Sequence, residues 1–170
     1  MAMQFKFNTQ NFKERYISLN YDERHFTNEK LVSEWESSGM IRESLTMGVN
    51  QIEEPFDWMQ DFLQQLSVVN LNNKEYCFGR LLPGHFLPLH SDTYNFYKKK
   101  YGISDTNSVV RMIVFLNYGV PGQLLVVDNK TYSNWKPGDA VLWQGATPHL
   151  AANLSKLNRY TLQITGTLDD

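Results

Sequence analysis

The chain has 170 residues, of which 42% are hydrophobic and 20% charged, and its net charge is −2. This length suits one domain with one core, and the charge balance argues against a surface built to bind nucleic acid or an anionic membrane. The single cysteine, Cys77, excludes an intramolecular disulfide and is interpreted as a buried core residue. No signal peptide or long apolar segment is evident, so a cytoplasmic location is expected.

Residues 1–74 are expected to form a mixed, partly helical N-terminal part of the single domain 1–170, packed on a sheet from residues 75–170. Residues 3–19 show no clear period and offer at most an edge strand. A helix is predicted over 28–38, with Gly39 as its stop. A second helix is predicted over 55–66, where Pro55 suits the first turn. Residues 70–73 are predicted to be a turn.

The pattern then changes to short apolar runs separated by glycine- and proline-containing turns. Strands are predicted over 76–82, 109–116, 123–127, 139–143 and 159–165. Many short strands at this spacing indicate a sandwich or jelly roll. The fold class expected is therefore mainly β with flanking helices. Residues 93–104 look helical or loop-like and are expected to wall or cover a site, because they follow a motif with ligand-type side chains.

That motif is His90-Ser91-Asp92, which carries an imidazole and a carboxylate two positions apart. On a strand, positions i and i+2 face the same side, so both groups can reach one ion. His149, which follows the predicted strand 139–143, is the candidate third ligand. Two histidines and one carboxylate form the facial triad of non-haem Fe(II) oxygenases. His85 is interpreted as a residue near the substrate and not as a ligand.

Arg159 lies ten residues after His149, at the start of a predicted strand. If this strand lies in the core, the guanidinium offers a planar fork for a carboxylate, and Thr161 adds a hydroxyl on the same face. A dicarboxylate such as 2-oxoglutarate needs this second anchor, because its other end can chelate a metal. The alternative for Arg159 is an exposed charge on an edge strand.

The order of motifs over 80–164 resembles the catalytic core of the Fe(II)/2-oxoglutarate oxygenases, in particular the prolyl hydroxylase-like group. The resemblance is carried by the segments 80–92 (RLLPGHFLPLHSD), 110–117 (VRMIVFLN), 135–143 (WKPGDAVLW) and 159–161 (RYT). It implies a double-stranded β-helix of the jelly-roll or cupin-like type. It also implies Fe(II) on His90, Asp92 and His149, 2-oxoglutarate as cosubstrate, dioxygen as oxidant, and ascorbate as a supporting reductant.

Two positions depart from the pattern of this group. Arg80 and Phe115 stand where many relatives have tyrosines that face the cosubstrate. Arg80 is therefore a candidate for cosubstrate binding, beside Arg159 and Thr161. Arg111 is a further cation that either binds cosubstrate or substrate or lies on the surface of its strand.

The leading functional hypothesis is a hydroxylase acting on an amino-acid side chain, with a prolyl residue of a peptide or protein as the expected substrate. The alternatives are an aspartyl, asparaginyl or small-molecule hydroxylase, for which the extra arginines favour an anionic substrate. A non-catalytic metal-binding jelly-roll module and a zinc hydrolase are the alternatives from other classes. Nucleic-acid demethylation is disfavoured, because Thr165 stands where such relatives tend to have an arginine. No nucleic-acid or membrane partner is expected, and the oligomeric state is left open.

Overall fold

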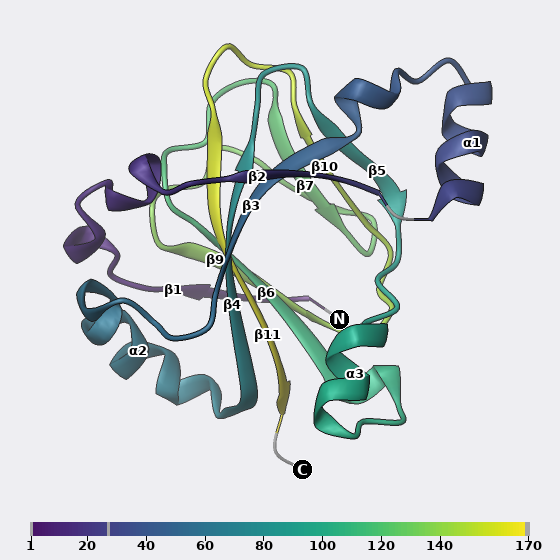
Figure 1. Ribbon diagram of the computed structural model, residues 1–170. Helices are drawn as coiled ribbons and strands as arrows, with labels where there is room; N and C mark the ends of the chain where they lie inside the picture. The colour runs from purple at the N-terminus through teal and green to yellow at the C-terminus, as the bar shows by residue number, and fades with distance from the viewer. Residues whose placement is uncertain (1, 27, 169–170) are drawn as a thin grey trace.

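The computed structural model describes residues 2–26 and 28–168, and in this part of the chain two antiparallel sheets lie face to face (Figure 1). The major sheet has the order β1-β9-β6-β11-β4-β3-β2, and the minor sheet has the order β5-β10-β7-β8. The strands of the major sheet are β1 Met3–Lys6, β2 Asp22–His25, β3 Thr46–Ile52, β4 Leu71–Leu81, β6 Val109–Phe115, β9 Asp139–Gln144 and β11 Arg159–Leu168. Those of the minor sheet are β5 Phe86–His90, β7 Gln123–Val127, β8 Lys130–Tyr132 and β10 His149–Asn153. The expected jelly roll, mainly β with flanking helices, is confirmed.

Strand alternation explains how the major sheet separates a core from a site. On β11, Tyr160, Leu162 and Ile164 belong to a core on the outer face of the sheet. The residues that alternate with them, Arg159, Thr161 and Gln163, face the inner space and line a pocket. The strands β4, β6 and β9 alternate in the same way, and the outer core also receives Phe12, Met59 and Phe62 from the first 66 residues. Both faces of the sheet are thus covered, which accounts for its nearly continuous apolar runs.

The helices are α1 Glu29–Ser37, α2 Gln60–Leu66 and α3 Asn95–Tyr101, with short 3₁₀ turns at Gln10–Phe12, Arg15–Ser18, Arg42–Ser44, Asp57–Met59, Ser67–Val69 and Thr106–Ser108. α1 agrees closely with its predicted range. Its Asn28 side chain caps the start by accepting a hydrogen bond from the Leu31 backbone. α2 begins five residues later than predicted, because the chain at Phe56 is extended and a 3₁₀ turn intervenes. No helix in the described residues is long and apolar enough to cross a membrane.

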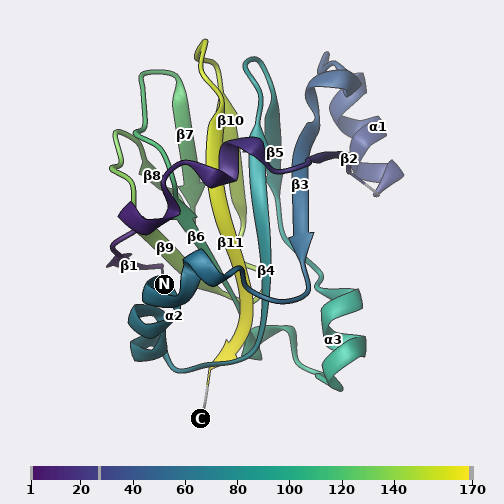
Figure 2. The same cartoon turned by 60° about the vertical axis from the view of Figure 1, so that its left-hand side comes forward.

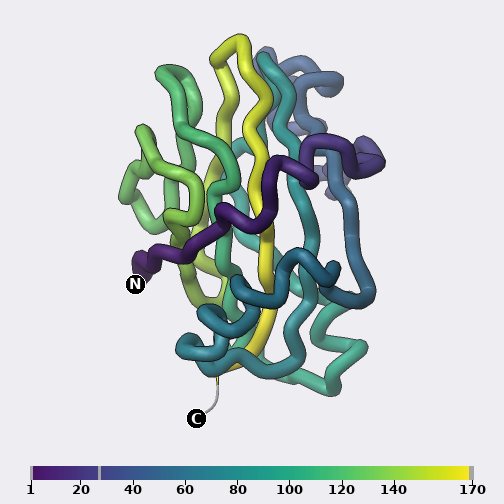
Figure 3. The backbone as a smooth tube through the Cα atoms, turned by 90° about the vertical axis from the view of Figure 1, so that its left-hand side faces the viewer, coloured from purple at the N-terminus to yellow at the C-terminus, as the bar shows by residue number. Residues whose placement is uncertain are grey.

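Figure 2 shows α2 against the outer face of the major sheet, and Figure 3 shows the first residues crossing the same face. The N-terminal part also supplies strands: β1 pairs with β9, and β3 joins β2 to β4. The predicted strand ranges do not include β2, β3, β5, β8 or β10. The turn predicted at 70–73 is also wrong, because β4 begins at Leu71. Asn73, with φ of 51°, is accommodated there by a bulge opposite β11.

Candidate metal and cosubstrate site

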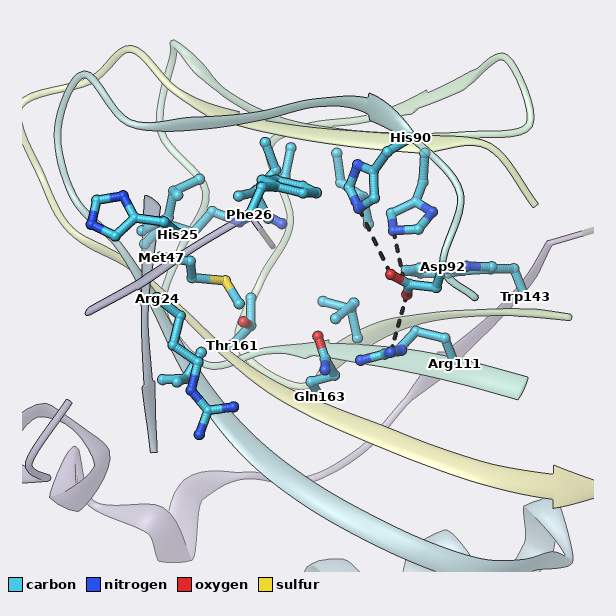
Figure 4. A pocket seen from close by; sticks show the side chains of 18 residues that line it. Arg24, His25, Phe26, Met47, His90, Asp92, Arg111, Trp143, Thr161 and Gln163 are labelled. Carbon is cyan, nitrogen blue, oxygen red and sulfur yellow. Dashed lines mark ion pairs between the residues drawn. The ribbon is translucent and has the colours of Figure 1, made fainter. Parts of the chain in front are cut away.

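The three predicted metal ligands meet at one end of the pocket between the two sheets (Figure 4). His90 ends β5 and His149 begins β10, and the two residues are partners in the pairing of these strands. The Nε2 atom of His90 lies 3.9 Å from Oδ1 of Asp92, and Nε2 of His149 lies 3.8 Å from Oδ2. The ligand atoms all lie within 4.8 Å of one another. Asp92 lies beyond the end of β5, so a bend in the chain brings it to the histidines, and not the strand alternation that we expected.

Both imidazoles are oriented by the backbone. Nδ1 of His90 is 2.6 Å from the Pro88 carbonyl oxygen, and Nδ1 of His149 is 2.9 Å from the Thr147 carbonyl oxygen. Each Nδ1–H can donate to its carbonyl, which leaves the Nε2 lone pair facing Asp92. Such outer hydrogen bonds are usual for histidines that bind metals. Two imidazoles that each present a free Nε2 lone pair, together with one carboxylate, therefore fit a divalent ion with open positions, as in the facial triad.

Arg111 holds the carboxylate of the triad in place. Its Nη2 lies 3.0 Å from Oδ2 of Asp92, and its guanidinium lies 5.1 Å from the ring centre of Tyr94. Burial raises the pKa of Asp92, but the charge of the Arg111 guanidinium, followed by the smaller interactions with His149 and His90, outweighs burial, so the pKa is lowered overall. Burial also lowers the pKa of His149, to about 4, so this imidazole is neutral near pH 7. Of the two interpretations of Arg111, the structure supports a place in the pocket and excludes the surface.

A cavity of about 290 Å³ extends from the triad to Arg159 and Thr161. Arg159 is only 4% exposed, and its Nη1 donates to the Leu124 carbonyl oxygen at 3.0 Å. The guanidinium lies 5.5 Å from the ring centre of Phe115 and 5.1 Å from that of Trp135. It has no carboxylate partner among the described residues, and burial lowers its pKa to about 10. A buried cation without a counter-ion is costly unless an anion binds to it.

Gly79 makes room for the Thr161 side chain. The two residues are partners in the pairing of β4 with β11. A Cβ atom at position 79 would lie 2.8 Å from the Thr161 hydroxyl oxygen, which is closer than real Cβ contacts. The absence of a side chain at Gly79 therefore leaves the hydroxyl free to face the cavity beside Arg159.

Arg80 does not lie in the pocket, contrary to the expectation that it binds cosubstrate. Because it is the strand partner of Tyr160, it faces the outer side of the sheet. There its Nη2 pairs with Oε1 of Glu23 at 3.0 Å, and its guanidinium lies over the ring of Tyr21. His85 also lies outside the pocket lining, and its Nδ1 is 2.7 Å from the Thr46 hydroxyl.

Residues 93–104 do not cover the pocket. α3 packs beneath it, where Tyr94 and Tyr97 form a small cluster with Val109. The hydroxyl of Tyr97 donates to the Asn73 carbonyl oxygen at 2.9 Å, which ties the helix to β4. The segment therefore supports Arg111 from below and contributes no side chain to the cavity wall.

Several pocket residues were not predicted from the sequence. Arg24 and Phe26 come from β2 and the residue after it, and the Phe26 ring meets the His90 ring edge-on at 4.7 Å. No motif marks this region, so the sequence offered no signal. Gln163 could have been found, because it lies two and four positions after Thr161 and Arg159 on the same strand face.

Comparison with known proteins agrees with this geometry. A profile of the family described as aspartyl/asparaginyl beta-hydroxylase matches residues 6–166. A search of curated proteins finds no match. Among solved structures, a Pseudomonas putida prolyl-4-hydroxylase matches with a TM-score of 0.55 and 17% identity, over 92% of this chain and 96% of that chain. The Cupin_2 domain of an XRE family transcriptional regulator from Enterobacter cloacae gives a TM-score of 0.45 and 15% identity, over 72% and 98%. At these identities, the structural matches concern the fold.

Proposed function

The chain belongs to the aspartyl/asparaginyl beta-hydroxylase family, and on this basis we propose that it is a 2-oxoglutarate-dependent Fe(II) oxygenase that hydroxylates an amino-acid side chain. The membership agrees with the resemblance of the motif order to the prolyl hydroxylase-like group. The observation that carries the proposal is the placement of two sites in one cavity. The triad lies at one end, and a buried arginine that has no counter-ion among the described residues lies on the wall.

Different residues of the pocket would bind the metal and the cosubstrate in such a reaction. His90, Asp92 and His149 would hold the iron, while Arg159 and Thr161 would bind the distal carboxylate of 2-oxoglutarate. When bound, the metal and cosubstrate supply the activation of dioxygen and the oxidation of a C–H bond to C–OH.

Other side chains keep water away from the reacting end. Phe26 packs against His90, and the Trp143 ring lies 5.0 Å from that of His149. Leu125 and Ala151 from the minor sheet complete an apolar wall. A dry wall of this kind strengthens the electrostatic interactions of the ions inside it.

The substrate is proposed from the family name and the notably cationic pocket. The family description favours aspartyl or asparaginyl side chains. The prolyl substrate expected from the motif order stays a prediction, since the prolyl-4-hydroxylase match concerns the fold alone. An aspartyl, asparaginyl or prolyl group could reach the site as part of a peptide or protein, or as a free amino acid.

The test is first a binding measurement and then a turnover measurement. We expect 2-oxoglutarate to bind, by calorimetry, only when Mn(II) is present. With Fe(II), air and ascorbate, aspartyl, asparaginyl and prolyl peptides are then compared for stimulated succinate release. Metal binding without any effect on 2-oxoglutarate affinity would contradict the proposal and support a non-catalytic jelly-roll module.

A further inference from the structure

The side chains that line the pocket carry a net positive charge that a bound metal ion and cosubstrate would not neutralise. Among the described residues that line it, the arginines are Arg24, Arg111 and Arg159, and the one carboxylate is that of Asp92. A divalent ion and a dianionic cosubstrate cancel each other. The loaded pocket therefore keeps two positive charges, which favours one more anionic group.

Arg24 is the pocket arginine for which the proposed metal and cosubstrate sites have no role. Arg111 is paired with Asp92, and Arg159 lies beside Thr161. In the described residues Arg24 makes no ion pair, since its neighbour Glu23 faces the other side of the sheet and pairs with Arg80. Figure 4 shows Arg24 on the opposite side of the pocket from His90 and Asp92.

Gln163 lies on the wall of the pocket between Arg24 and Arg111 (Figure 4). Its side chain is half-buried on the same face of β11 as Thr161, and in the described part of the chain its amide makes no hydrogen bond. Figure 4 shows the amide pointing into the pocket between Thr161 and Arg111. An amide with both a free donor and a free acceptor, in a pocket wall, is suited to fixing the orientation of a polar ligand group.

The surroundings of Cys77 support the convergence of these groups. Cys77 is the strand partner of Gln163. Burial raises the pKa of the Cys77 thiol, while the charges of Arg111 and Arg24 act to lower it. The strand pairing places Arg24 and Arg111 on the same face of the sheet as Cys77 and Gln163.

Resting on the proposed function, we propose that Gln163 and Arg24 form the substrate end of the pocket and bind a carboxylate of the substrate. The Gln163 amide and the Arg24 guanidinium donate to the two carboxylate oxygens. A carboxamide in the same place keeps the hydrogen bond from Gln163 but loses the charge interaction with Arg24. The carboxylate belongs either to an aspartyl side chain or to a free amino acid.

The experiment compares matched carboxylate and carboxamide probes on the protein loaded with Mn(II) and 2-oxoglutarate, which binds without turnover. One arm uses an aspartyl peptide and its asparaginyl counterpart, and the other uses L-proline and L-prolinamide. In at least one arm the wild-type protein is expected to bind the carboxylate about tenfold more tightly or better, as charge-assisted hydrogen bonds imply. Arg24→Gln is expected to bring this ratio towards one, whereas Gln163→Met is expected to weaken the binding of both probes and to leave their ratio nearly unchanged. Arg15→Gln, an exposed change of equal charge outside the pocket, leaves it unaltered.

The outcomes separate this inference from the proposed function. A wild-type protein that shows no Mn(II)-dependent binding of 2-oxoglutarate refutes both. A protein that binds 2-oxoglutarate but prefers no carboxylate probe, or binds none, overturns the inference alone. The same holds if Arg24→Gln keeps the wild-type ratio, or if Gln163→Met keeps the wild-type affinity for both probes, while circular dichroism shows that the variant is folded.

Discussion

Replacing Arg159 by methionine separates the stability cost of a buried charge from its use in binding an anion. Burial lowers the pKa of Arg159 from 12.5 to about 10, which corresponds to a penalty of roughly 3 kcal/mol for the charged form. Methionine removes this penalty. It also removes the hydrogen bond to the Leu124 carbonyl, worth about 1 kcal/mol, and the contacts with Phe115 and Trp135, worth about 1 kcal/mol together.

The ligand-free Arg159→Met protein should therefore be more stable than the wild type by about 1 kcal/mol. For a chain of this size, that raises the midpoint of thermal unfolding by roughly 2–4 °C. The affinity for 2-oxoglutarate in the presence of Mn(II) should fall by at least about two orders of magnitude, because the distal carboxylate loses a buried ionic partner. Differential scanning calorimetry gives the first quantity and titration calorimetry gives the second.

Arg80→Met is the matched control, since Arg80 lies on the other face of the same sheet. It should lose the surface pair with Glu23 and keep the 2-oxoglutarate affinity of the wild type. The reasoning is refuted if Arg159→Met binds 2-oxoglutarate normally. It is also refuted if the variant is clearly less stable than the wild type without ligand, since the guanidinium would then stabilise the fold.

Three further predictions concern the residues around Arg159 and the triad. Gly79→Ala should weaken 2-oxoglutarate binding and lower the midpoint of thermal unfolding, because the new methyl group would meet the Thr161 hydroxyl. The added change Thr161→Ala should restore the stability but not the affinity, and a double-mutant cycle would measure this coupling. Arg111→Met should lower the free energy of unfolding of the metal-free protein by about 2–4 kcal/mol, measured in urea, since Asp92 loses its partner; an unchanged midpoint would show that the pair contributes nothing. The metal-free protein should lose stability as the pH falls from about 6.5 towards 4, because the pKa of His149 is lower in the folded chain and the unfolded chain takes up the proton first; His149→Gln should flatten this part of the profile.

The sequence alone determined the parts of the site that follow one another along the chain. The spacing of His90, Asp92, His149 and Arg159 predicted which residues gather, and the short apolar runs predicted the mainly β fold. These features are visible in sequence because each strand has a two-residue period and each motif occupies a few neighbouring positions.

What the sequence left open depended on contacts between distant segments. It could not decide that Arg80 faces outwards, because the assignment of a face requires the register with Tyr160. It also could not show that Arg24 and Phe26 reach the pocket. These residues lie more than 60 positions before His90 in the sequence, and only the pairing of β2 with β3 brings them to the same cavity. The local pattern selects an element, whereas only the packed sheets decide which side chains share a cavity and which charges there lack a partner.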